Sequence, residues 1–231
     1  MKGFNLFVSV AFLGAMLLLS SCKKDENPVS PPSGGTNYVG TIAGNSESGS
    51  MSFNIPSSSA KWSPSKVTGV QTLLTITGTL KIAGGATITL TGTFNTENDS
   101  IRITGGGYTF AGELVGGKVQ GSYDGPSGSG TFAVQSSSSS STVKVYLGSY
   151  HETSPTTTET GVINIVVDGT SVTVLVTSGE VYYGTISGNA VTIYLSGTSG
   201  TVLASGNLSG STMSGTYNTG DSSGSWTATL N

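Results

Sequence analysis

The chain contains a single cysteine and a single histidine among its 231 residues. One cysteine cannot form an intramolecular disulfide, and one cysteine with one histidine cannot supply the ligands of a zinc-type site. We therefore expect neither a disulfide framework nor a metal centre of this kind, and the sequence contains no motif that calls for another cofactor.

Charged residues are also scarce, at 9% of the chain, and the net charge is −3. Domains that bind nucleic acid carry a strongly basic surface, so nucleic acid is excluded as an expected partner. Low charge and 8% aromatic residues are compatible with disorder. However, Val, Ile and Thr recur with the period of a β-strand through most of the chain, which favours an all-β fold.

No hydrophobic run is long enough for a comfortable membrane-spanning helix, which needs about 20 residues. The apolar run Phe4–Leu19 follows the positive charge of Lys2, and we interpret residues 1–21 as a signal peptide. The run leads into Leu19-Ser-Ser-Cys22, which resembles the lipobox of bacterial lipoproteins. This resemblance implies that Cys22 is diacylated and anchors the protein in a membrane through its acyl chains, palmitate among them. The alternative is an ordinary secretory signal.

Residues 22–36 are predicted to be the lipidated cysteine and a disordered tether. Lys23–Glu26 resembles the charged signal that sends lipoproteins to the exterior of the outer membrane in some Gram-negative phyla, although it could equally be a solvated charge run. Proline and glycine dominate residues 27–36, and this composition is typical of an extended spacer. We expect an outer-membrane protein that faces the periplasm or the cell surface.

Short β-prone runs separated by turn residues fill the rest of the chain. Residues 74–82 and 87–94 alternate apolar residues or glycine with threonine or lysine, and Gly84-Gly85 between them is typical of a two-residue hairpin turn. Asp168-Gly169 is a similar turn signal in the second half. We count about eight predicted strands in each half of the globular part.

The two halves end in the same motif. Gly112–Tyr123 matches Gly206–Tyr217, and each segment is followed by one more predicted strand. Within the match, the equivalent residues are Leu114 and Leu208, Val119 and Met213, Gly121 and Gly215, and Tyr123 and Tyr217. The sequence therefore predicts an internal repeat.

The predicted repeats are residues 37–135 and residues 143–231. A serine-rich linker, residues 136–142, separates them because it cannot contribute to a core. Each repeat also contains a predicted loop after its first strands, at residues 56–68 and 151–160.

Eight short antiparallel strands leave two unpaired edges unless the sheet closes on itself. We predict two tandem antiparallel β-meander domains, each an up-and-down barrel of about eight strands. The pattern resembles barrels of the streptavidin and lipocalin kind, and the Gly-x-Trp-x-Ala ending resembles that of many bacterial lipoproteins. The resemblance implies an interior filled by side chains or holding one small ligand. A β-sandwich or one continuous sheet is the alternative.

The sequence shows no convincing catalytic constellation, and we predict that the protein is not an enzyme. His151 lies in a Thr- and Ser-rich loop beside Glu152, and the other carboxylates are scattered through turns and strands. Abundant serine makes any Ser-His-acid combination uninformative. A hydrolase is the least favoured of the functions considered.

Aromatic residues are the best candidates for a binding role. Five are predicted to face the barrel interiors, where filling the core is the simplest role: Tyr108, Phe110, Tyr123, Tyr217 and Trp226. Four tyrosines are expected to share faces with polar residues, namely Tyr146, Tyr150, Tyr183 and Tyr194, and Trp62 lies in a proline-rich loop. The candidate ligand-binding residues among these five are Trp62, Tyr146, Tyr183 and Tyr194. We expect a binding protein for a small hydrophobic ligand, a glycan or a protein; a structural or adhesive surface lipoprotein is the alternative.

Overall fold

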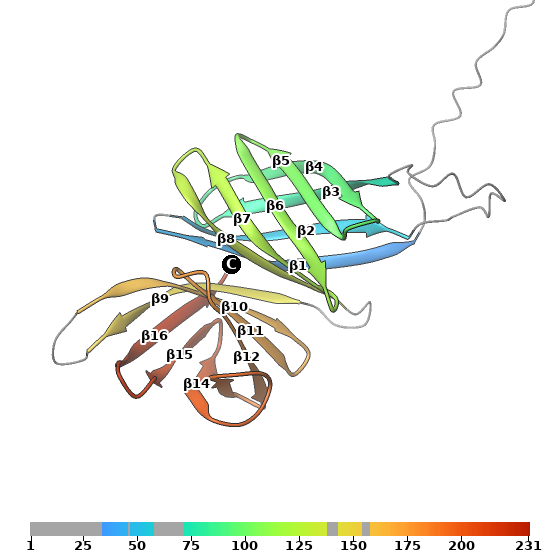
Figure 1. The fold of residues 1–231 in the computed structure, drawn as a ribbon. Helices are drawn as coiled ribbons and strands as arrows, with labels where there is room; N and C mark the ends of the chain where they lie inside the picture. The colour runs from blue at the N-terminus through green and yellow to red at the C-terminus, as the bar shows by residue number, and fades with distance from the viewer. Residues whose placement is uncertain (1–33, 46, 58–71, 138–142, 154–157) are drawn as a thin grey trace, which may run out of the picture. The chain divides into compact units, whose positions relative to one another are not determined.

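The computed structural model describes residues 34–45, 47–57, 72–137, 143–153 and 158–231 (Figure 1). All the regular structure in these residues is β-strand. Accordingly, no helix in this part of the chain is long and apolar enough to cross a membrane. The predicted signal peptide, Cys22 and Trp62 lie outside the described residues.

The first eight strands form a closed antiparallel barrel, the first barrel, in which β1 pairs with both β2 and β8 (Figure 1). Its strands are β1 Gly35–Gly44, β2 Ser48–Pro56, β3 Leu73–Ile82, β4 Thr87–Asn95, β5 Ser100–Gly105, β6 Tyr108–Val115, β7 Lys118–Gly125 and β8 Gly128–Ser136. Consecutive strands are neighbours throughout, so the topology is a meander closed end to end.

The next eight strands form the second barrel, closed in the same way by the pairing of β9 with β10 and β16. Its strands are β9 Lys144–Glu152, β10 Thr160–Asp168, β11 Ser171–Val176, β12 Val181–Ser187, β13 Ala190–Tyr194, β14 Val202–Ser209, β15 Thr212–Asn218 and β16 Ser223–Leu230. The prediction of two tandem closed barrels is confirmed, and the described strands form neither a sandwich nor a continuous sheet.

Some predicted boundaries differ from the structure by one or two residues. β1 begins at Gly35, inside the predicted tether, and β8 ends at Ser136, the first residue of the predicted linker. His151 was expected in a loop, but it pairs with Ser225 near the end of β9. Thr- and Ser-rich composition is a weak guide to a strand end, because threonine is also common within strands.

The strand register of the two barrels is the same around the point of closure, and we call residues at the same register position equivalent. Tyr38 lies opposite Ser136 in the first barrel, and Tyr146 lies opposite Leu230 in the second. The terminal motifs also superpose in register: Leu114 and Val119 are cross-strand partners, as are their counterparts in β14 and β15. The sequence repeat is therefore a structural repeat.

A pair of glycines in each terminal motif makes room for a large aromatic ring. Gly112 and Gly121 lie opposite each other in the first barrel, as Gly206 and Gly215 do in the second. A Cβ atom added at Gly112 would lie 2.8 Å from the ring of Phe132, and one at Gly206 would contact the ring of Trp226. Because glycine has no side chain, the aromatic ring can lie against the backbone of the strand on the inner face of the barrel.

We predict that Gly215→Ala destabilises the second barrel by about 1–3 kcal/mol. A Cβ atom at this position would overlap the carbonyl oxygen of Ser205, and backbone cannot move aside as a flexible side chain can. Urea unfolding followed by circular dichroism measures the change. Gly85→Ala is the control, because its Cβ would make only ordinary contacts with Ile82; equal stabilities of the two variants would contradict the prediction.

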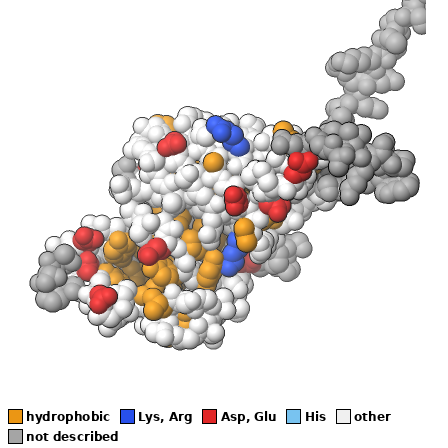
Figure 2. Space-filling view, in the orientation of Figure 1, with side chains coloured by type: hydrophobic (Ala, Val, Ile, Leu, Met, Phe, Trp, Pro, Cys, Tyr) orange, Lys and Arg blue, Asp and Glu red, His pale blue; other side chains and the backbone are white. Residues whose placement is uncertain are grey.

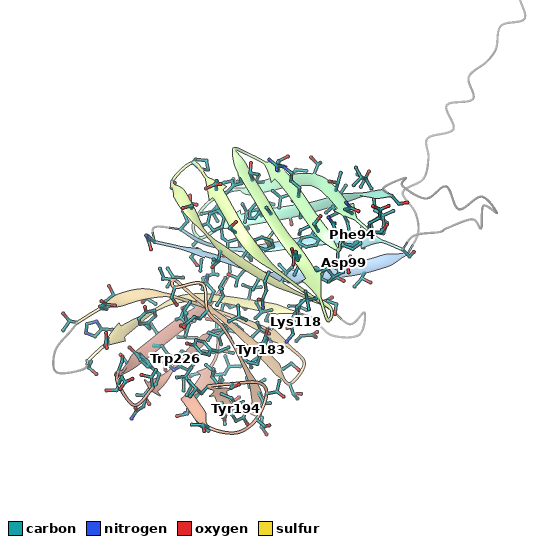
Figure 3. All side chains as sticks on the ribbon, in the orientation of Figure 1. Phe94, Asp99, Lys118, Tyr183, Tyr194 and Trp226 are labelled. Carbon is teal, nitrogen blue, oxygen red and sulfur yellow. The ribbon has the colours of Figure 1, made fainter. Side chains whose placement is uncertain are left out.

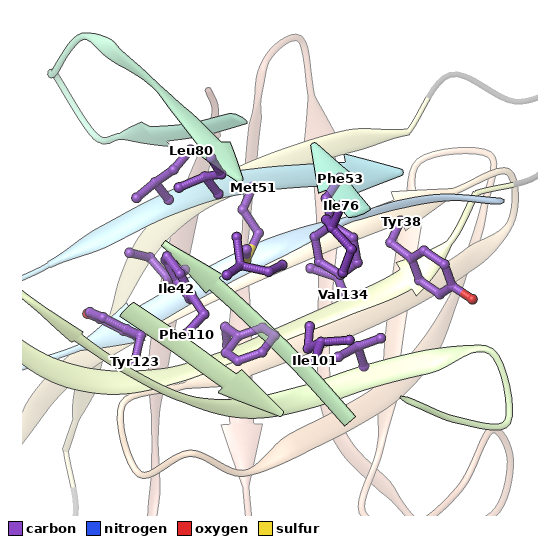
Figure 4. Close-up of a cluster of buried hydrophobic side chains, with 14 of the residues drawn as sticks. Tyr38, Ile42, Met51, Phe53, Ile76, Leu80, Ile101, Phe110, Tyr123 and Val134 are labelled. Atoms are coloured by element: carbon purple, nitrogen blue, oxygen red, sulfur yellow. The ribbon is translucent and has the colours of Figure 1, made fainter. Parts of the chain in front are cut away.

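The first barrel is filled by side chains (Figure 4). Phe110 is fully buried and packs edge-on against Phe132, with a ring-centroid distance of 5.6 Å, and lies 5.7 Å from the ring of Tyr123. Tyr38 stacks on Phe53 farther along the barrel. The interior of this domain is thus a hydrophobic core.

Strand β10 of the second barrel is buried on both faces, and its outer face contacts β1 of the first barrel. Asn164 is fully buried, donates to the carbonyl oxygen of Ile42 at 2.7 Å, and accepts from the hydroxyl of Ser48 at 2.7 Å. Ala43 and Leu175 pack together nearby. The near-continuous apolar run of β10 follows from this burial, because a strand covered on both faces loses the apolar–polar alternation.

Candidate ligand cavity in the second barrel

A cavity of about 370 Å³ occupies one end of the second barrel. At this end of the barrel, strands β9, β11, β13 and β15 end and the strands that follow them, β10, β12, β14 and β16, begin. Figure 2 shows hydrophobic side chains gathered on this barrel, with acidic side chains around them. A cavity of this size is within the range of small-molecule sites, roughly 300–1,000 Å³.

Aromatic and aliphatic side chains form most of the cavity wall. Tyr150 and Tyr217 meet edge-to-face, with ring centroids 6.0 Å apart. Trp226 lies inside the barrel (Figure 3), and its Nε1 donates to the carbonyl oxygen of Thr216 at 3.3 Å. Ile193 and Ala204 line the wall beside them. Such a wall can bury an apolar molecule and hold an aromatic group by its edge or face.

One large side chain of the first barrel is replaced by a small one beside the cavity of the second. Phe110 lies opposite Ile103 and Tyr123, and Ala204 lies opposite Ile193 and Tyr217. The two residues are therefore equivalent. The benzyl group that fills the first barrel at this point has no counterpart in the second.

The matching end of the first barrel is closed by polar and aromatic residues. Glu47 is buried and accepts a hydrogen bond of 2.9 Å from the hydroxyl of Tyr108, whose ring lies beside Tyr123. Burial, followed by the interaction with Glu47, raises the pKa of Tyr108 to about 12. Burial and the charge of Glu47 raise the pKa of Tyr123 to about 12 as well. Both phenols are therefore neutral at physiological pH, and this end of the first barrel is occupied.

Three carboxylates surround the polar end of the cavity in the second barrel. They belong to Glu152 at the end of β9, to Glu159 just before β10, and to Glu180 just before β12. The Oε2 atom of Glu180 accepts hydrogen bonds from the hydroxyls of Tyr182, at 2.7 Å, and Ser178, at 3.2 Å. Among the described lining residues no lysine, arginine or histidine is present, so the glutamates are the only charged groups of the wall.

Burial and the negative charge of the glutamates raise the pKa of two tyrosines of the cavity. Burial raises the pKa of Tyr150, and Tyr217 and the three glutamates raise it further. Burial and the hydrogen bond to Glu180 raise the pKa of Tyr182 to about 12. Both side chains therefore remain neutral hydroxyl donors over the physiological pH range. The effect of all three glutamates on Tyr150 shows that their carboxylates surround the same part of the cavity.

The predicted ligand-binding tyrosines do not come together in this cavity. Tyr146 was expected to share a face with polar residues, but it is 2% exposed and belongs to the core of the second barrel. Its neighbours Val145 and Leu147 are also apolar, so alternation could not assign its face. The expectation of an exposed Tyr146 is wrong.

Tyr183 and Tyr194 are half-buried cross-strand partners on the outer face of β12 and β13. The Nζ atom of Lys118 lies 3.4 Å from the centroid of the Tyr183 ring (Figure 3), and the hydroxyl of Tyr183 accepts a hydrogen bond of 3.1 Å from Gln120. Tyr183 thus contacts the first barrel, and its ring face is covered by a cation.

Sequence reasoning missed the combination of Tyr150, Tyr182 and the glutamates. The sequence did contain a signal for this, because residues two apart in a strand point to the same side. Glu152 and Glu180 are each two residues from an inward-facing tyrosine, Tyr150 and Tyr182 respectively. His151, which lies between Tyr150 and Glu152, points to the other side of the strand and is exposed. Within the described residues no group of three or more His, Cys, Asp or Glu side chains has a geometry that could hold a metal ion.

The chain matches no protein-family model and shows no significant similarity to a curated protein sequence. The cavity and its lining therefore provide the main basis for a functional proposal.

Proposed function

We propose that the protein is a lipid-anchored, non-catalytic binding protein that takes up a small, largely apolar molecule in its second barrel. The observation that supports this most strongly is the contrast between the two repeats. They share their topology and, apart from a register shift between Ile193 and Tyr194, their strand register, yet one is filled and the other contains a cavity of about 370 Å³. Eight-stranded barrels are wide enough to hold one small ligand when their side chains leave room for it.

The first barrel serves as a filled companion domain in this proposal. Its core is continuous, and its matching end is occupied by Glu47, Tyr108 and Tyr123. The absence of catalysis is part of the proposal and is supported by the exposed position of His151, which does not line the cavity.

The uptake of an apolar molecule can be tested with N-phenyl-1-naphthylamine, a neutral dye that fluoresces in apolar surroundings. The full-length chain carrying Cys22→Ala is used, so that purification needs no detergent that could fill the cavity. We expect saturable binding of one dye per chain with a Kd on the order of 10 μM. Failure to observe saturable binding would contradict the proposal and favour a structural or adhesive role.

The anchor is proposed from the lipobox resemblance, with the outer membrane as the location. We predict that Cys22→Ala moves the protein from the membrane fraction to the soluble fraction and abolishes labelling by radioactive palmitate, because alanine has no thiol to carry the acyl chains that anchor the protein. Ser21→Ala is the matched control, since it leaves the thiol in place. Unchanged membrane association and labelling of the Cys22→Ala protein would reject lipidation.

A further inference from the structure

We propose that the ligand of the second barrel is an organic cation: an apolar body that carries a protonated amine or a quaternary ammonium group. This inference rests on the proposed function, because it concerns the same cavity. It assigns the charge of the ligand, which cavity size and apolar lining alone do not determine.

The first observation is the position of the carboxylates relative to the apolar wall. On β9, Glu152 lies opposite Gly224, and Tyr150, two residues deeper in the barrel, lies opposite Trp226. Glu180 precedes β12 in the same way, with Tyr182 two residues farther in. The cavity is therefore apolar and aromatic at depth and anionic at its end.

The second observation is that the fold does not require these carboxylates. The position equivalent to Glu152 is Gly44, which lies opposite Gly130 in the first barrel. The position equivalent to Glu180 is Ile88, which lies opposite Leu80. The first barrel is thus built with glycine and isoleucine at these two points, although it keeps a carboxylate, Glu47, at the position equivalent to Glu159. The carboxylates of Glu152 and Glu180 are therefore specific to the repeat that has the cavity.

The third observation concerns charge. Three carboxylates lie close enough to Tyr150 to raise its pKa, and Glu152 among them is only 9% exposed. In the described part of the chain, no cationic side chain lines the cavity. A bound cation would place a positive charge beside these carboxylates, which is a favourable interaction.

The aromatic wall fits the same ligand class. Tyr150, Tyr217 and Trp226 present rings to one volume, and aromatic rings attract ammonium groups through their negative faces. An anionic ligand would meet carboxylates at the end of the cavity. A neutral ligand would leave the carboxylates without a counter-ion.

The test uses three probes with the same naphthalene body: 1-naphthylmethylamine as the cation, 1-naphthalenemethanol as the neutral form and 1-naphthoate as the anion. Their affinities for the full-length Cys22→Ala chain are measured by isothermal titration calorimetry. We expect the amine to bind about tenfold more tightly than the alcohol, and the naphthoate to bind most weakly.

Glu152→Gln and Glu180→Gln, alone and together, preserve the shape of the side chains and remove their charge. The double variant should lose the roughly tenfold preference for the amine while changing the affinity for the alcohol less than about twofold. Glu97→Gln, at an exposed turn of the first barrel that does not line the cavity, is the control and should keep the preference. A thermal melt of each variant verifies folding.

The outcomes separate this inference from the proposed function. Equal affinity for the amine and the alcohol would overturn the cationic ligand and leave apolar binding in place. A preference for the amine that survives in the double variant would overturn the role assigned to Glu152 and Glu180. Absence of binding for all three probes would overturn both this inference and the proposed function.

Discussion

Replacing Ala204 by phenylalanine is expected to abolish ligand binding in the second barrel. The first barrel shows the result of this substitution, because its equivalent residue, Phe110, is fully buried and occupies the corresponding space. In the second barrel the new ring would enter the volume between Ile193 and Tyr217. We expect the affinity for N-phenyl-1-naphthylamine to fall by about tenfold or more, equivalent to at least ~1.4 kcal/mol of binding free energy.

The measurement is a dye titration of the Ala204→Phe protein, with unfolding in urea to verify that the barrel is intact. Ala190→Phe is the matched control: it is the same change at an exposed position of β13 that does not line the cavity. Retention of full affinity by the folded Ala204→Phe protein would place the binding site elsewhere. A loss of affinity in Ala190→Phe as well would show a non-specific effect of the added ring.

The reverse change, Phe110→Ala, is expected to destabilise the first barrel by about 3–5 kcal/mol. Phe110 contacts the rings of Tyr108, Tyr123 and Phe132, with centroid distances from 5.6 to 6.2 Å. Removing its ring loses the transfer free energy of the side chain and leaves a void that these fixed neighbours cannot fill.

Urea unfolding of the Phe110→Ala protein measures this cost. Leu73→Ala is the control, because Leu73 is 55% exposed and its truncation should change stability by no more than about 0.5 kcal/mol. A cost for Phe110→Ala below about 1 kcal/mol would mean that the interior of the first barrel is loosely packed. The contrast between a filled and an unfilled repeat would then lose its basis.

The fold could be predicted from the sequence because its determinants are local. Alternating apolar residues and threonine define strands, and Gly84-Gly85 and Asp168-Gly169 mark hairpin turns. The repeated glycines Gly121 and Gly215 occur where a Cβ atom would overlap the backbone of the preceding strand. Meander topology needs no long-range pairing except the contact between first and last strands.

The cavity was harder to predict because it depends on the difference between two repeats. Phe110 and Ala204 occupy the same place in the matched motifs, so the exchange is visible once the repeats are aligned. Its consequence is not visible, because a small residue in a barrel can be compensated by a larger neighbour. Whether Leu203 and Trp226 compensate is decided by three-dimensional packing.

The acidic end of the cavity was not predicted for a different reason. Glu152, Glu159 and Glu180 come from three separate segments, and closure of the barrel brings them around Tyr150. The sequence analysis treated the carboxylates as scattered because spacing along the chain says little about distance across a barrel. The contact between β1 and the outer face of β10 was missed similarly, although the double-sided apolar character of residues 163–167 is a signal of burial on both faces.

The central claim is that the second barrel holds a ligand beside Trp226, and energy transfer tests it most directly. The chain has two tryptophans, so Trp62→Phe in the Cys22→Ala protein leaves Trp226 as the only donor. We predict saturable transfer from Trp226 to bound N-phenyl-1-naphthylamine, with one dye per chain, and its loss when Ala204→Phe is added. Absence of saturable transfer, or transfer of equal strength and affinity in the folded Ala204→Phe protein, would contradict the account.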